Sequence, residues 1–176
     1  MATASSTTTL HLLRHAHAAV ALPGQGDHQR PLDSRGQRDA PRICEAIAGE
    51  AASIDVVLCS TSARTRQTLD ALRPFLGPQA SVVFCDTLYE SGAEAYFQKV
   101  KTCGAPGTVL VIGHNPSIEE FAIELAGDGE PSSMALLREG MPTAALATLS
   151  FPTDLAAIAP GSGFLQRLLR PRDLEV

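Results

Sequence analysis

The chain has 176 residues, of which 44% are hydrophobic and 19% are charged, and its formal net charge at pH 7 is −5. This length suits one compact domain, so we expect residues 1–176 to form a single domain with residues 1–8 as a flexible lead-in. The acidic balance argues against nucleic acid and anionic membrane surfaces as partners, because both need a basic field. No apolar run approaches the roughly 20 residues of a membrane span, so no membrane partner is expected.

The four cysteines lie far apart and form no Cys-x-x-Cys pair. Zinc cages and disulfide frameworks normally show tighter spacing, so reduced thiols in a cytoplasmic protein are the preferred interpretation. The start of the chain lacks the basic segment and the apolar stretch of a signal peptide. We therefore expect a cytoplasmic protein.

Strand-like and helical patterns alternate along the chain. Apolar runs of strand length occupy residues 10–13, 55–59, 81–84 and 108–112. Helical patterns occupy residues 34–50, 63–73, 93–102 and 117–126. Pro41 falls inside the first of these and must kink that helix or begin its regular part, because it has no N–H. Residues 127–140 are assigned to a loop, and residues 144–151 and 155–158 to two further strands.

This alternation predicts an α/β fold, a three-layer α/β/α sandwich with a mostly parallel central sheet. In such sheets, ligands bind beyond the carboxyl ends of the strands. Polar segments follow the first four predicted strands, and we expect them to meet at one edge of the sheet. They are Arg14–His17, Ser60–Thr68, Leu88–Ser91 and Gly113–Pro116.

The residue types in these segments indicate a phosphate ligand. Guanidinium groups bind the tetrahedral oxygens of phosphate bidentately, and Arg14 and Arg64 would supply them. Helix N-termini near residues 62–64 and 115–117 would aim backbone N–H groups at the same anion. His17 and Asn115 are further candidates for this site.

Two histidines beside the arginines indicate chemistry as well as binding. Neighbouring cations disfavour imidazolium, so a histidine at this edge can stay neutral and nucleophilic. A histidine nucleophile can form a covalent intermediate that divides a difficult displacement into two steps. Phosphoryl transfer also needs neutralisation of the equatorial oxygens, which Arg14, Arg64 and the second histidine can supply without a metal or other cofactor.

Three motifs in this order resemble those of the histidine phosphatase superfamily, whose fold is phosphoglycerate mutase-like. Leu13-Arg14-His15-Ala16 resembles its Arg-His-Gly signature, with Ala in place of Gly. Residues 60–68 resemble its second arginine motif, and Gly113-His114-Asn115 resembles its second histidine motif. Residues 30–36 and 141–144 are similar to the SixA-type phosphohistidine phosphatase branch.

The resemblance, which runs from about residue 9 to 160, implies roles for individual residues. His15 would be the phosphorylated nucleophile, and Arg14, Arg64 and His114 would bind the phosphoryl oxygens. Glu90 stands where other branches of the superfamily often place a proton donor. The implied activity is metal-independent removal of a phosphoryl group through a phosphohistidine intermediate. The expected partner is a phosphorylated protein carrying phosphohistidine, with a small phosphomonoester as the alternative.

Three other functions compete with this hypothesis. A metal-dependent hydrolase would use His15-x-His17, but the adjacent arginines would repel a dication. A cysteine phosphatase would use Cys59, but only four residues separate it from Arg64. A non-catalytic phosphate-binding module would keep the arginines and would not need an unprotonated His15.

Overall fold

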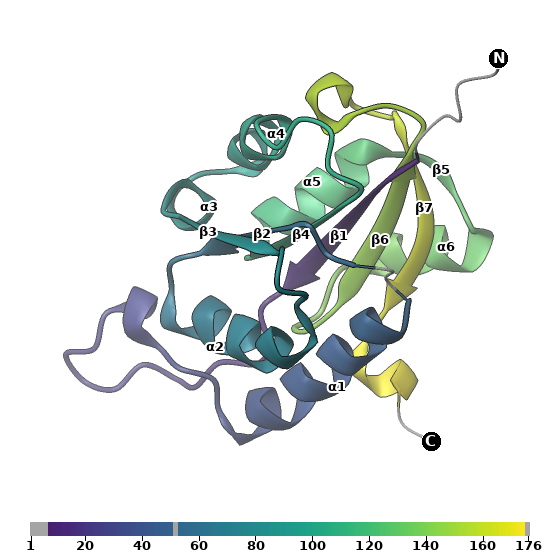
Figure 1. Ribbon diagram of the computed structural model, residues 1–176. Helices are drawn as coiled ribbons and strands as arrows, with labels where there is room; N and C mark the ends of the chain where they lie inside the picture. Colours follow the sequence, from purple (N-terminus) through teal and green to yellow (C-terminus); the bar gives the residue numbers. More distant parts are fainter. Residues whose placement is uncertain (1–6, 51–52, 175–176) are drawn as a thin grey trace, which may run out of the picture.

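In the computed structural model, which describes residues 7–50 and 53–174, one seven-stranded sheet organises the chain (Figure 1). Its strands are β1 (Thr8–Arg14), β2 (Val56–Ser60), β3 (Ser81–Cys85), β4 (Thr108–Gly113), β5 (Ala126–Gly129), β6 (Leu146–Phe151) and β7 (Gly163–Leu169). The helices are α1 (Ser34–Glu50), α2 (Ala63–Leu72), α3 (Thr87–Glu90), α4 (Ala93–Lys101), α5 (Ser117–Leu125) and α6 (Pro131–Glu139). Short 3₁₀ helices are η1 (Asp27–Gln29), η2 (Arg73–Phe75), η3 (Leu155–Ala157) and η4 (Pro171–Leu174).

The sheet is mostly parallel. Its strand order is β3-β2-β4-β1-β6-β7-β5. Strands β1 to β4 run in the same direction, and β5 is parallel to β7. Strand β6 is antiparallel to both β1 and β7. The predicted mostly parallel α/β architecture is therefore confirmed.

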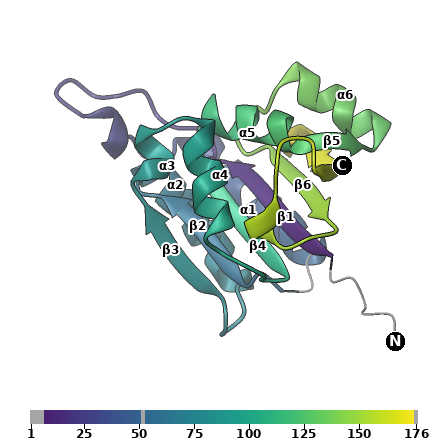
Figure 2. The ribbon, with the colours of Figure 1, turned by 90° about the horizontal axis from the view of Figure 1, so that it is seen from above.

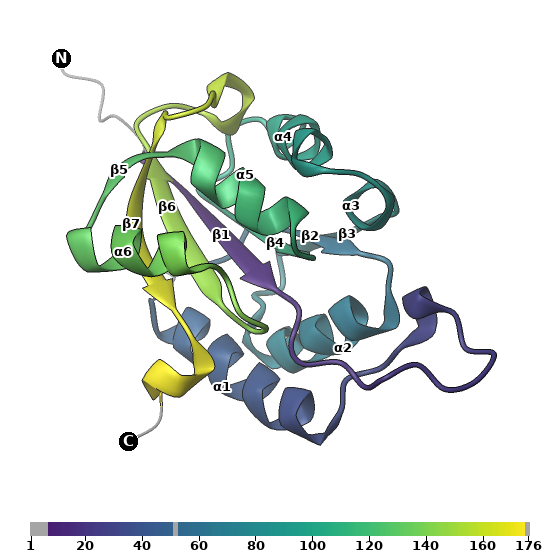
Figure 3. The ribbon, with the colours of Figure 1, turned by 180° about the vertical axis from the view of Figure 1, so that it is seen from behind.

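Helices cover both faces of the sheet, and a separate apolar cluster fills each interface. Helices α1 and α2 lie on one face, and α4, α5 and α6 lie on the other (Figures 1 and 3). In β1, Leu12 packs into the cluster that contains Phe121 of α5, and Leu13 packs into the one that contains Ile43 of α1. Strand β4 is buried on both faces, which explains why it is the most continuous apolar run in the sequence.

The strand register brings the ends of three strands to the same place. Arg14, the last residue of β1, pairs with Gly113 at the end of β4, and Ile112 pairs with Cys59 near the end of β2. Because β6 is antiparallel to β1, the segment that precedes it also returns to this edge. The polar residues that follow β1, β2 and β4 therefore start from neighbouring points, as the parallel order predicts.

The prediction of a loop over residues 127–140 is wrong. Strand β5 and helix α6 occupy this stretch. The strand is only four residues long and contains no strong strand former, so its pairing with β7, rather than its own propensity, defines it. The helix begins at Pro131 and is followed by Gly140 with φ of 108°, which are ordinary start and stop signals.

Expectations for several other segments of the chain also need correction. Residues 155–158 form no strand, because the 3₁₀ helix η3 occupies most of them. Residues 161–176, which had no predicted structure, supply β7 and η4. Thr8 is buried in β1 and is not part of a lead-in, whereas residues 1–6 lie outside the described part of the chain. Pro41 is exposed and lies inside α1, which already begins at Ser34, so Pro41 does not begin the helix.

Candidate active site

Three of the predicted residues meet at the carboxyl edge of the sheet. Arg64 donates from Nε to His15 Nε2 at 3.3 Å, and its Nη2 lies 3.4 Å from His114 Nδ1. The two imidazole centroids are 5.1 Å apart. All three side chains are buried. The expected convergence of the second arginine motif with both histidine motifs is therefore observed.

The hydrogen bonds of His15 leave one ring nitrogen unprotonated. Its Nδ1 lies 2.7 Å from the backbone oxygen of Ala16, and because a carbonyl only accepts, Nδ1 must carry the proton. The unprotonated Nε2 then presents its lone pair toward Arg64. This tautomer, with Nε2 bare, is the one that a nucleophilic imidazole needs.

The surroundings of His15 keep its ring neutral. Burial lowers its pKa from 6.5 to about 4, and the hydrogen bond to Ala16 opposes this shift. The nearby Arg64 and Arg14 lower the pKa further, but less than burial does. A neutral imidazole is also predicted from the sequence, but there its stated cause is repulsion by the neighbouring arginines. Desolvation of the ring is the larger cause, which no residue spacing could reveal.

Three backbone hydrogen bonds fix the main chain that carries the His15 ring. The N–H of His15 donates to Gly113 at 3.0 Å, and its carbonyl accepts from Ala144 at 3.0 Å. The N–H of Ala16 donates to Thr68 Oγ1 at 3.1 Å. Ala144 adopts a left-handed conformation, with φ of 58°, at this contact. The nucleophile candidate is therefore positioned by β4, by α2 and by the segment that precedes β6.

His114 is held from two sides. Its Nε2 lies 2.7 Å from Ser60 Oγ, and its backbone N–H donates to Tyr96 Oη at 3.1 Å. Because the arginine can only donate to Nδ1, Nε2 carries the proton and donates to Ser60. Burial, then His15 and Arg64, lower the pKa of His114 to about 3. A bound phosphoryl dianion would favour the protonated form, so this ring can bind an anion once one arrives.

Helix α2 aims Arg64 into the site. Ser62 caps the helix, and Thr65 Oγ1 donates to the carbonyl of Ser60 at 2.7 Å, which ties the first turn to the end of β2. The outer edge of the guanidinium donates to the backbone oxygen of Asp27 at 2.8 Å and to its Oδ2 at 3.0 Å. Arg64 therefore spans from a carboxylate at the surface to both buried histidines.

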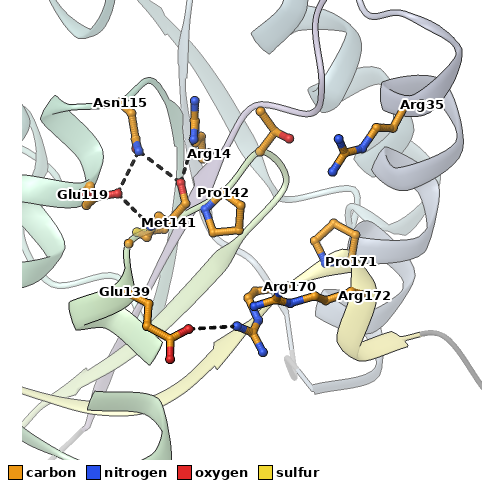
Figure 4. Close-up of a pocket in the computed structure, with 12 residues that line it drawn as sticks. Arg14, Arg35, Asn115, Glu119, Glu139, Met141, Pro142, Arg170, Pro171 and Arg172 are labelled. Carbon is orange, nitrogen blue, oxygen red and sulfur yellow. Dashed lines mark hydrogen bonds and ion pairs between the residues drawn. The ribbon is translucent and has the colours of Figure 1, made fainter. Parts of the chain in front are cut away.

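Arg14 and Asn115 are joined by a backbone carbonyl. Both donate to the oxygen of Met141, at 2.8 Å and 3.1 Å, and Asn115 also donates to Glu119 at 2.8 Å (Figure 4). Among the described residues, the buried Arg14 Nε and Asn115 Oδ1 have no hydrogen-bond partner. A half-buried guanidinium with an unused Nε donor is suited to an anion. Asn115, by contrast, already serves to hold the Met141 segment in place.

A cavity of about 450 Å³ opens beside Arg14 (Figure 4). It lies between the start of α1, the segment after α6 and the 3₁₀ helix η4, with Arg35, Arg170 and Arg172 on its walls. Arg170 is paired with Glu139 at 3.5 Å. His15 is not among the lining residues. The cavity therefore adjoins the arginine side of the site without containing the reactive ring.

Two predicted candidates take other positions. His17 Nδ1 lies 2.7 Å from Asp33 Oδ2, so this ring is paired with a carboxylate at the start of α1 and not with the buried cluster. Glu90 ends α3 with an exposed side chain that makes no hydrogen bond or ion pair within the described residues. Its neighbour Tyr89 faces the site instead, with its ring 5.4 Å from that of His114.

Asp27 and Tyr89 are site residues that the sequence did not reveal. Tyr89 Oη donates to Asp27 Oδ2 at 2.9 Å, and the same oxygen accepts from Arg64. Asp27 is separated from the Arg14-His15 motif by a glycine-containing loop, so no spacing rule connects them. Tyr89 directly precedes Glu90 in the sequence.

The competing functions find little support in the geometry. Cys59 is fully buried, and burial raises its pKa to about 12, so this thiol is not a nucleophile at neutral pH. Within residues 7–50 and 53–174, no three His, Cys, Asp or Glu side chains are grouped to hold a metal ion. In the same residues, no helix has both the length and the apolar character to cross a membrane.

The buried histidines predict that acid destabilises the fold. His11, which bonds Thr148 in the core, and His15 have pKa values of about 4, and His114 has one of about 3, against 6.5 in the unfolded chain. Below pH 6.5 the unfolded chain therefore binds up to about three more protons than the folded one, so the free energy of unfolding decreases as pH falls toward 4. Urea unfolding at pH 7.5, 6.5, 5.5 and 4.5 measures this. A free energy of unfolding that stayed constant over this interval would contradict the buried neutral rings.

Comparison with known proteins identifies relatives over most of the chain. The sequence profile of the histidine phosphatase superfamily (branch 1) matches residues 10–99. An uncharacterised protein of Mycobacterium tuberculosis, Rv1276c, is 33% identical over 160 residues, which is 89% of this chain and 99% of the relative. The phosphohistidine phosphatase SixA of Escherichia coli is 29% identical over 124 residues, which is 68% of this chain and 75% of the relative. The structure of a candidate phosphohistidine phosphatase SixA from Nakamurella multipartitia is similar, with 35% identity, a TM-score of 0.77 and coverage of 94% and 96% of the two chains.

Proposed function

Because the chain belongs to the histidine phosphatase superfamily, and is a hydrolase of phosphoric bonds that works through phosphohistidine, we propose that it removes the phosphoryl group from phosphohistidine on another protein. The observation that carries this proposal is the tautomer of His15. A neutral ring with its Nδ1 proton engaged by Ala16 leaves Nε2 bare beside a guanidinium. A site that only bound phosphate would have no use for this arrangement.

We assign the steps to residues as follows. His15 Nε2 attacks phosphorus in line with the leaving group, so that one P–N bond forms while the bond to the substrate breaks. Arg64, Arg14 and His114 neutralise the phosphoryl oxygens, which gain charge as the group transfers. Water then attacks phosphohistidine-15 and releases inorganic phosphate. The hydrogen bonds to Gly113 and Ala144 hold the ring during both steps.

Two features favour a protein-borne phosphohistidine over a small phosphate ester. The loop that carries η1 extends from the body of the molecule (Figure 2), and its residue Asp27 contacts Arg64 of the site. It presents Val20 and Leu22, whose relative exposures are 85% and 69%, as apolar surface that a protein partner can cover. The side chain of Glu90, the expected proton donor, is exposed and makes no hydrogen bond or ion pair within the described residues. Esters of alcohols need such a donor more than the P–N bond does.

We also propose a cytoplasmic location. The four cysteines, Cys44, Cys59, Cys85 and Cys103, are free. Free thiols in a protein of this size fit a reducing compartment.

The proposal is tested by comparing three substrates: a protein phosphorylated on histidine, p-nitrophenyl phosphate and an alkyl phosphate. We expect kcat/KM for phosphohistidine to exceed that for the alkyl ester by about 10²-fold or more. The alkyl ester needs a general acid to protonate its leaving group, and without one its cleavage loses a rate factor of that size. A chelator should not change any of the rates. Glu90→Gln should leave all three unchanged. Equal large losses on phosphohistidine and ester in this variant, or an alkyl ester cleaved as fast as phosphohistidine, would defeat the substrate preference.

A further inference from the structure

The carboxylate of Asp27 is held at the mouth of the candidate site by three donors. Its Oδ2 accepts from Arg64 Nη2 at 3.0 Å and from Tyr89 Oη at 2.9 Å. Its Oδ1 accepts from Arg30 Nε at 2.9 Å. The backbone oxygen of Asp27 accepts from Arg64 as well, at 2.8 Å. Both the position and the orientation of this carboxylate are therefore fixed before any substrate binds.

One accepting position of the carboxylate is still open. An ionised carboxylate can accept about four hydrogen bonds, and the described residues use two on Oδ2 and one on Oδ1. The Asp27 side chain is 54% exposed, whereas that of Arg64 is 6% exposed. The carboxylate thus lies between Arg64 and solvent. In an in-line transfer, the leaving group departs from the side of phosphorus opposite His15 Nε2. Arg64 bridges His15 Nε2 and the Asp27 carboxylate, so Asp27 is an exposed acceptor within reach of a ring bound beside Arg64.

The charge on Asp27 is negative at neutral pH. Partial burial would raise the pKa of its carboxyl, but the hydrogen bonds from Tyr89 and Arg64 outweigh this and lower the pKa below its ordinary value. An ionised carboxylate cannot donate a proton. It can accept one N–H bond and stabilise a cation beside it. Asp27 is therefore unsuited to the general-acid role that an ester would require.

Flat rings stand next to this carboxylate. Tyr89 packs edge-to-face against His28, with centroids 4.7 Å apart, and against His114, with centroids 5.4 Å apart. Aromatic side chains in such arrangements favour another planar ring beside them. The mouth of the site thus combines a fixed negative charge with an aromatic wall, which together match the imidazole ring of a phosphohistidine.

We propose that Asp27 binds the leaving ring of the substrate by accepting a hydrogen bond from its distal N–H, and so selects P–N over P–O bonds. This inference rests on the proposed function and deepens it. In the step, His15 Nε2 bonds to phosphorus while the electron pair of the substrate P–N bond stays on the departing nitrogen. The ring enters as an imidazolium with its proton on the distal nitrogen, and leaves as neutral imidazole with that proton still in place. No external acid is consumed.

The test compares Asp27→Asn with the wild-type protein on phosphoimidazole and on p-nitrophenyl phosphate at about pH 8, where few free phosphorylated rings are cationic. The first substrate contains the P–N bond and the ring, whereas the second releases a phenolate that needs no proton. We expect kcat/KM to fall about 10- to 100-fold on phosphoimidazole, as when a hydrogen bond to a charged group is lost, and less than about threefold on the ester. Equal losses on both substrates would show that Asp27 only positions Arg64, and would overturn the inference, as would no loss on either.

Two further variants keep the test decisive. Glu90→Gln changes an exposed carboxylate that makes no hydrogen bond or ion pair within the described residues, so both rates should be unchanged. Tyr89→Phe removes one donor to Oδ2 but leaves the charge and Oδ1 intact, so it should weaken phosphoimidazole cleavage less than Asp27→Asn does. The opposite ranking would contradict the assignment. If the wild-type protein hydrolyses the ester but neither phosphoimidazole nor phosphohistidine, the proposed function itself fails, and the inference fails with it.

Discussion

Replacing His15 with Asn should lower kcat/KM for every phosphorylated substrate by on the order of 10⁴-fold or more, because the variant has no nucleophile. Asn is the informative substitution, since its side-chain amide can still donate to the carbonyl of Ala16 in place of Nδ1–H. The site keeps its shape and its arginines and loses only the reactive nitrogen. Steady-state kinetics with p-nitrophenyl phosphate measures the loss, and thermal unfolding checks that the fold persists.

His17→Asn is the matched control for this experiment. It removes a second histidine from the same segment, but the structure pairs that ring with Asp33, away from the buried cluster. Activity should stay within a few-fold of the wild-type value. A His15→Asn variant that kept more than a small fraction of activity, or a His17→Asn variant that lost as much, would mean that the wrong histidine has been assigned.

Replacing Arg64 with Ala should lower kcat by about 10³-fold, because the guanidinium is the group that contacts both histidines. Its charge is preorganised by the hydrogen bond to the backbone oxygen of Asp27 and by the first turn of α2, so it neutralises the phosphoryl oxygens without rearrangement. Arg64→Lys should recover only part of the activity. An ammonium retains the charge but cannot reach His15, His114 and Asp27 with separate donors.

Arg66→Ala provides the comparison for the arginine variants. This side chain is two residues further along the same helix, where it donates to the carbonyl of Thr61 and stacks on Phe84 at the surface. We expect nearly unchanged kcat. A similar loss in the Arg64 and Arg66 variants would indicate that general disturbance of α2, and not the lost phosphate contact, lowers the rate.

Much of this site could be predicted from the sequence because parallel strands impose a simple geometry. Once β1, β2 and β4 are placed in one parallel sheet, the residues that follow their carboxyl ends must lie close together. The segments that carry Arg14, His15, Arg64 and His114 do start from neighbouring strand ends. Long apolar runs such as β4 identify the strands reliably, since they are buried on both faces. The alternation of strands and helices then fixes the layers.

What the sequence could not reveal depends on tertiary contacts. Strand β5 has no apolar pattern and exists through its pairing with β7. The contact between Asp27 and Arg64 joins residues 37 positions apart, through a loop whose path no local rule predicts. The burial that sets the pKa of His15 likewise depends on the packed structure. The expectation for Glu90 rested on the family resemblance, whereas the neighbouring Tyr89 is the side chain that lies against His114.

Trapping the covalent intermediate tests the nucleophilic role of His15 most directly. The wild-type protein is mixed with a labelled phospho-donor, quenched within the first turnover, and split into acid and alkaline portions before peptide mapping. Transfer through His15 predicts a label on the peptide that contains His15, lost in acid and stable in base, as expected for a phosphoramidate, and no label on His15→Asn. A label that survives acid, that maps to Cys59, or that persists in the variant would contradict transfer through the imidazole.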